Sequence, residues 1–158
     1  MEFKENKCSV KARKVFVEHH NISLDIWYDK HYLDRYQHGD ENGKRDGIDP
    51  SIIGKLIRKS IHYLIVFSAA IKNFNFLNPT KTQNPIRIVL RDSNVPEILN
   101  VAIEAHIISP TNYEITVKTA MLIENFKMAT GQYMIDSQGD AISLLKFENK
   151  TFIEVFSF

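Results

Sequence analysis

Apolar residues follow two different spacings along this chain, and the spacing changes after residue 71. In the segment "IDPSIIGKLIRKSIHYLIVF" (48–67), isoleucine and leucine recur every three or four positions, which is typical of a helix with one buried face. Asp49 is a favourable capping residue for such a helix, and Pro50 suits its first turn. We therefore predict an amphipathic helix from Asp49 to about Phe67.

Beyond the irregular stretch "NFNFLNPTKTQNP", polar and apolar residues alternate, as they do in strands with one buried face. The segments with this pattern are 85–92, 98–109, 113–122, 132–136 and 141–147, with 151–158 as a final edge strand. Upstream, residues 23–28 predict a short strand, and Asp29 is placed to cap a short helix that ends near His38. The predicted fold class is α+β, with two N-terminal helices packed on one face of an antiparallel sheet.

The segments 98–109 and 113–122 are predicted to form a hairpin. Its register follows if the apolar residues of both strands are buried on the same face of the sheet. That condition pairs Ile107 with Ile115, Ala105 with Val117 and Ile103 with Thr119. On the other face, Glu104 would then lie opposite Lys118, and His106 opposite Thr116. Such groups can transfer protons and stabilise an anion, although Glu–Lys pairs are also common on solvated sheet faces. Both interpretations stay open at this point.

Composition limits the classes of partner. The 158 residues suit one domain with a substantial core, and we expect residues 1–158 to form a single domain with residues 1–7 flexible. Lys and Arg total 20 against 19 Asp and Glu, so attraction for phosphate would have to come from a local patch. The single cysteine, Cys8, excludes an internal disulfide. We expect a cytoplasmic protein, because the start lacks a signal-peptide pattern and the longest apolar stretch, 61–71, is too short for a bilayer.

The segment "YDKHYLDRY" (28–36) places His31 and Arg35 four residues apart, on one face of the predicted short helix. After a loop it is followed by "RDGIDPSIIGKLIRKSI" (45–61). Together the two segments resemble the helical half of RelE-like endoribonucleases, and among these the RegB-like enzymes that cleave messenger RNA. The resemblance implies a RelE-like fold, in which two helices precede a curved antiparallel sheet.

The resemblance also implies roles for individual residues. His31 matches the histidine of the family's first helix and would transfer protons, while Arg35 would contact phosphate. The second histidine of RegB-like proteins falls at Arg58 in this chain, so either His62, one turn further along, or a histidine on the sheet would have to replace it. Arg45 lies in the loop between the two helices and is a further candidate for substrate binding.

The expected reaction is metal-independent cleavage of single-stranded or messenger RNA by attack of the 2′-hydroxyl group. Glu104, His106 and Lys118 would complete the catalytic site on the sheet, and Thr116, Arg58 and His62 would help to bind substrate. The protein would be toxin-like or phage-encoded, with an antitoxin or a host protein as a further partner. No H-E-x-x-H or paired-cysteine spacing occurs, so we expect neither a metal nor another cofactor.

A second class of function stays open, namely a non-catalytic module that binds a protein, as an antitoxin-type or phage inhibitor does. Phe126, Met128 and Met134 near one turn suit an adaptable contact surface, although burial in the core explains them equally well. The arrangement of the candidate side chains separates the two hypotheses. Convergence in one open concavity favours the enzyme, whereas separate surface ion pairs favour the binding protein.

Overall fold

The computed structural model describes residues 3–4, 12–13, 22–30, 48–93 and 98–157 of the chain, and for the first two ranges only the backbone. The predicted helix after Asp29 and the segment 1–7 fall almost wholly outside these ranges. The described elements are β1 (Phe3–Lys4), β2 (Ala12–Arg13), β3 (Ser23–Tyr28), α2 (Pro50–Ala70), β4 (Leu77–Asn78), β5 (Arg87–Asp92), β6 (Leu99–Ser109), β7 (Asn112–Leu122), β8 (Tyr133–Gln138), β9 (Ala141–Glu148) and β10 (Thr151–Ser157).

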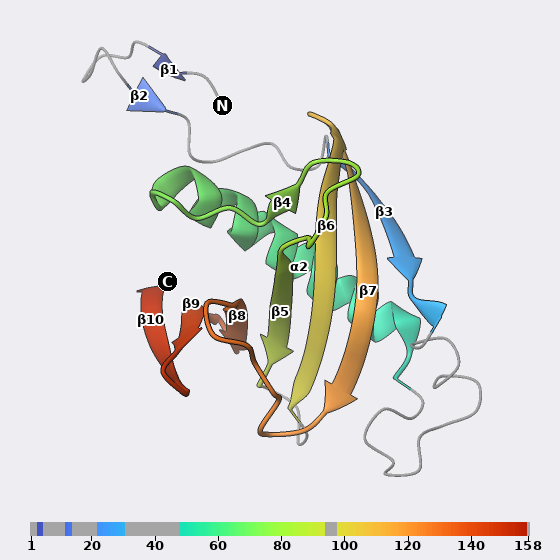
Figure 1. Ribbon diagram of the computed structural model, residues 1–158, viewed down its shortest axis with the longest axis vertical. Helices are drawn as coiled ribbons and strands as arrows, with labels where there is room; N and C mark the ends of the chain where they lie inside the picture. Colours follow the sequence, from blue (N-terminus) through green and yellow to red (C-terminus); the bar gives the residue numbers. More distant parts are fainter. Residues whose placement is uncertain (1–2, 5–11, 14–21, 31–47, 94–97, 158) are drawn as a thin grey trace.

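The predicted fold class, two N-terminal helices on a curved antiparallel RelE-like sheet, is wrong. The described residues form one helix and an eight-stranded mixed sheet in the order β10-β9-β8-β5-β6-β7-β3, with β4 paired to β6 (Figure 1). The strands β1 and β2 pair with each other in a separate two-stranded sheet. Three contacts are parallel, namely β3 with β7, β5 with β8 and β4 with β6. Alternating polarity reveals a strand but not its direction or its neighbour, so the sequence carries no local sign of these parallel pairs.

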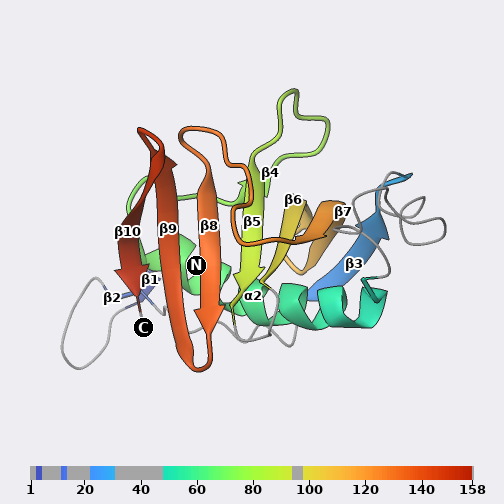
Figure 2. The ribbon, with the colours of Figure 1, turned by 90° about the horizontal axis from the view of Figure 1, so that it is seen from below.

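The predicted helix of residues 49–67 is confirmed as α2, which extends to Ala70. Asp49 caps it, because its side chain accepts a hydrogen bond of 2.8 Å from the backbone N–H of Ser51. The helix lies along one face of the sheet, as Figure 2 shows. Within the described part of the chain, no helix is long and apolar enough to cross a membrane.

Two apolar clusters lie on opposite faces of the sheet. The larger one fills the space between α2 and the sheet, where Phe67 and Ile115 are fully buried. The smaller cluster lies on the other face, which we call the outer face. Its members are Val89, Ala102, Met128 and Met134, packed against Phe126, Leu145 and Phe147. Because Met128 and Met134 are buried here, the proposed contact surface near this turn is largely core.

The predicted register of the β6–β7 hairpin is also wrong, by two residues. Ile107 lies opposite Tyr113 and Ile103 opposite Val117, because Pro110 and Thr111 alone connect the strands. A shift by two residues keeps the same side chains on the buried face. The sequence therefore predicts correctly which side chains of β6 lie on that face. The pairing then passes from Ile103–Val117 to Ala102–Thr119, which makes Lys118 an extra residue, or bulge, in β7. Past this bulge Thr119 belongs to the outer face.

Candidate functional site

Four side chains form a row across the outer face. Trp27 of β3 pairs in register with Thr116 of β7, Thr116 with Glu104 of β6, and Glu104 with Arg87 of β5. Neighbouring strands lie about 5 Å apart, so the row spans about 15 Å. The Trp27 side chain is 58% exposed, which is unusual for such a large apolar ring. The row therefore presents an aromatic surface at one end and charged groups at the other.

Glu104 and Arg87 form an ion pair within this row. Nη2 of Arg87 donates to Oε2 of Glu104 at 2.9 Å, and Nε donates to the same oxygen at 3.3 Å. The Glu104 side chain is only 12% exposed, whereas that of Arg87 is 44% exposed. The carboxylate therefore orients the guanidinium on the surface, and the pair presents mainly its positive partner to solvent.

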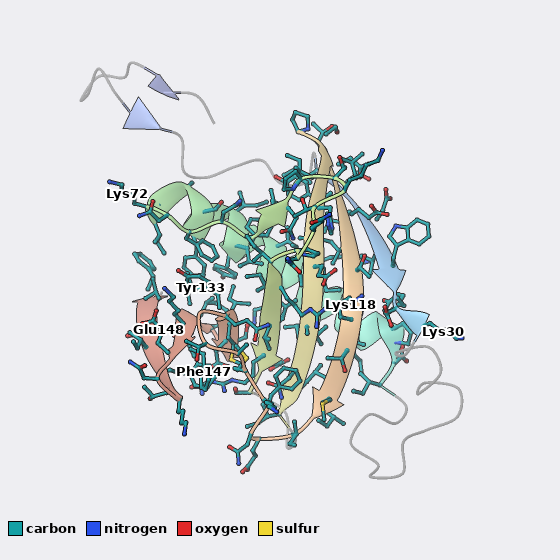
Figure 3. The ribbon with its side chains drawn as sticks, in the orientation of Figure 1. Lys30, Lys72, Lys118, Tyr133, Phe147 and Glu148 are labelled. Carbon is teal, nitrogen blue, oxygen red and sulfur yellow. The ribbon has the colours of Figure 1, made fainter. Side chains whose placement is uncertain are left out.

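Lys118 belongs to a second ion pair, at the end of β3. Its Nζ donates to Oδ2 of Asp29 at 3.1 Å, and both side chains are about one quarter exposed. In Figure 3 Lys118 lies on β7 and Lys30 lies just beyond the end of β3. The motif with His31 and Arg35 follows Lys30 directly in the sequence. The ion pair thus connects β7 to the residues that precede the motif.

His106 lies one row further along β6. Its register partner in β7 is Glu114 rather than the predicted Thr116, and its partner in β4 is Asn78. His106 is partly exposed, and Glu104 lies two residues away on the same face. Two residues along a strand span about 7 Å. Glu114 and Glu104 therefore occupy positions next to His106 on this face of the sheet.

Arg58 and His62 lie on the opposite side of the sheet from Glu104 and His106. They line a hollow of about 180 Å³ between α2 and β3, together with Ile22, Leu24 and Ile61. The pKa of the neighbouring Tyr28 is raised by burial, and the positive charge of Arg58 opposes part of that rise. The structure therefore does not bring Arg58 and His62 together with the candidate residues of the outer face.

The remaining predicted residues, His31, Arg35 and Arg45, lie outside the described ranges. Among the residues that the structure does describe, no three His, Cys, Asp or Glu side chains gather closely enough to hold a metal ion. The pattern of the sequence indicated Glu104, His106 and Thr116 as members of one face, and this is their position. Trp27 is a further aromatic residue near the motif, for which the sequence allowed either stacking on a base or burial in the core, and the structure leaves it exposed beside β7.

No model of a known protein family, no curated protein and no solved structure matches this chain.

Proposed function

We propose that the protein is a metal-independent endoribonuclease that cleaves single-stranded or messenger RNA in the cytoplasm, with the substrate bound on the outer face. The observation that carries this proposal is the ion pair between Lys118 and Asp29. It holds Asp29, which belongs to the segment 28–36 with the His31–Arg35 motif, against β7, the strand next to the one that carries Glu104 and His106. The resemblance to RelE-like endoribonucleases rests on that motif. In the proposed site, residues of the motif act together with residues of the outer face.

The reaction needs a base, an acid and positive charge near the phosphate. In the proposed mechanism a base takes the proton of the 2′-hydroxyl, and the 2′-oxygen attacks phosphorus. The bond from phosphorus to the 5′-oxygen breaks, and an acid gives a proton to that oxygen, which leaves a cyclic phosphate and a free 5′-hydroxyl. His106 and His31 are the proposed proton-transfer residues, because imidazole can take or give a proton near neutral pH.

Positive charge for the phosphate would come from Arg87 and Lys118. Arg87 is the better placed of the two, since its side chain is 44% exposed and is oriented by Glu104. An arginine fork can hold two oxygens of a phosphate, whereas a lysine acts as a single charge. Trp27 would stack on an unpaired base next to the scissile bond, because its ring is largely exposed on the same face.

Cleavage of a mixed RNA pool by purified protein tests the proposal, with a chelator present to remove metals. We expect wild-type protein to cleave, and His106→Ala to cleave about a hundredfold more slowly while it keeps its fold. The His62→Ala variant tests which histidine replaces the second histidine of RegB-like proteins. Cleavage should change little in this variant if His106 is that residue. Loss of cleavage only in His62→Ala would place the reaction on the α2 side and overturn the proposed site. A wild-type protein that cleaves no RNA would overturn the proposed nuclease activity.

A non-catalytic protein-binding module is the second candidate. It is favoured by the observation that Glu104 and Lys118 are each engaged in a separate ion pair, with Arg87 and Asp29. A wild-type protein that binds a host protein and leaves every RNA intact would support this alternative. The two functions thus give opposite results in the same cleavage experiment.

A further inference from the structure

A second hollow opens on the outer face, away from the row that contains Glu104. Its volume is about 360 Å³, within the usual range for small-ligand sites. It lies between the connection from β7 to β8 and the β9–β10 hairpin. Its walls include Arg91, Glu124, Asn125, Phe147, Lys150 and Phe152. A smaller hollow of about 250 Å³ also uses Asn125 and lies along the same connection.

One wall of this hollow is aromatic and held firmly in place. The rings of Phe147 and Phe152 meet edge to face with centroids 5.2 Å apart, and the guanidinium of Arg91 lies 5.5 Å from the Phe152 centroid. Arg91 is itself fixed by two hydrogen bonds to Asp136, of 2.9 and 3.0 Å. Ser93 donates a third hydrogen bond to that carboxylate, at 2.8 Å. The Phe152 ring is thus oriented, yet remains 36% exposed.

The turn of the β9–β10 hairpin adds a lysine beside this wall, at a position where glycine is more common. Asn149 and Lys150 form the two-residue turn between β9 and β10, and their φ angles are 51° and 64°. A hairpin turn of this kind requires positive φ at both residues, which is common for glycine and asparagine and uncommon for lysine. The turn brings Lys150 to the rim of the hollow.

The lining of the hollow suits a flat, uncharged ring that is joined to one anionic group. Asp136 neutralises Arg91, while Lys150 and Glu124 lie on the walls with opposite charges. Asn125 and Glu124 can accept hydrogen bonds from the edge of a base, and the Asn125 amide can also donate one. A nucleobase stacked on Phe152, with its phosphate near Lys150, satisfies all these groups.

We infer that this hollow binds an unpaired nucleobase of the RNA strand whose backbone crosses the row of Glu104 and Arg87. The inference rests on the proposed function. Arg87 and Arg91 are four residues apart on β5 and on the same face, so the two sites are about 13 Å apart. A base in the hollow would therefore lie within a few nucleotides of the cleaved bond and would make cleavage depend on the base at that position.

Binding of a short 2′-O-methyl oligoribonucleotide tests the inference, because this probe lacks the attacking hydroxyl and is not cleaved. Loss of stacking in Phe152→Ala should raise Kd about tenfold, and Phe152→Trp should restore binding. Phe156→Ala is the matched control. Phe156 lies on the same strand and is 39% exposed, but it packs against Phe67 on the α2 side. The Phe156→Ala variant should bind the probe as the wild-type protein does.

The outcomes separate this inference from the proposed function. If Phe152→Ala binds the probe as tightly as wild type, while wild-type protein cleaves RNA and His106→Ala cleaves it far more slowly, the proposed base site is wrong and the nuclease activity is supported. If Phe156→Ala weakens binding as much as Phe152→Ala, the effect comes from the edge strand and the base site is again overturned. If wild-type protein neither binds the probe nor cleaves RNA, both proposals fall.

Discussion

Nζ of Lys118 lies 3.1 Å from Oδ2 of Asp29, so a bulge residue of β7 is joined to the end of β3 across 89 positions of sequence. The pairing of β3 with β7 accounts for this contact. Tyr28 lies opposite Val117, and the backbone N–H of Asp29 donates to the carbonyl of Val117 at 2.9 Å. Asp29 and Lys118 are thus the next positions of the same parallel register, and the ion pair follows from the placement of β3 beside β7.

Lys118→Met is expected to reduce RNA cleavage by about tenfold or more, since the variant loses a positive charge near the phosphate. The free energy of unfolding should fall by only about 1 kcal/mol, because both side chains reach solvent, which screens the pair and can hydrate the Asp29 carboxylate that remains. Lys146→Met is the control: it removes a lysine that pairs with Glu148 at 2.9 Å, away from the row. Equal rates for both variants would argue against a role for Lys118.

Asn78→Ala should destabilise the protein by about 2–4 kcal/mol in urea denaturation. The Asn78 side chain is 1% exposed and makes three hydrogen bonds to the backbone. Its amide donates to the carbonyls of Ile86 and Ala105, both at 3.0 Å, and accepts from the N–H of Ile86 at 2.7 Å. Truncation leaves these backbone groups without partners at the junction of β4, β5 and β6. A variant as stable as wild type would show that water replaces the amide.

Arg91→Met should cost about 3 kcal/mol of folding free energy, because it leaves the Asp136 carboxylate buried without its cation. Asp136 is 7% exposed and receives both hydrogen bonds of the Arg91 fork. The double variant Arg91→Met/Asp136→Leu should recover much of the loss, since it removes both charges together. Thermal denaturation of the two variants checks this, and an additive double variant would contradict it.

The cap of α2 should make stability depend on pH in the acid range. Hydrogen bonds from Ser51 lower the pKa of Asp49 below its ordinary value of 3.8. A lowered carboxyl pKa stabilises the fold above the ordinary value, and the stabilisation is lost as the pH falls through the folded value. Asp49→Ala should therefore have a lower Tm than wild type at pH 7, and the difference should begin to shrink near pH 4 and vanish only below the lowered pKa of the folded state. Asp49→Asn should remain capped without this pH dependence.

Much of the secondary structure could be predicted from local pattern. Asp49, Pro50 and the apolar stripe that follows all act within a few residues, so α2 was predicted close to its observed bounds. The alternation of β6 likewise indicated that Ile103 and Ala105 are buried and that Glu104 faces the other way. Period and capping are properties of neighbouring residues, and a sequence displays them directly.

The sequence by itself therefore determined the long helix, most of the strands and the presence of Glu104, His106 and Thr116 on one sheet face. Only the tertiary structure decided the parallel pairing of β3 with β7, the partners of Lys118 and Glu104, and the separation of Arg58 and His62 from that face. The reason is that alternation specifies a face but not a neighbour. Neighbours are chosen by the packing of the whole sheet and by bulges that local pattern does not show.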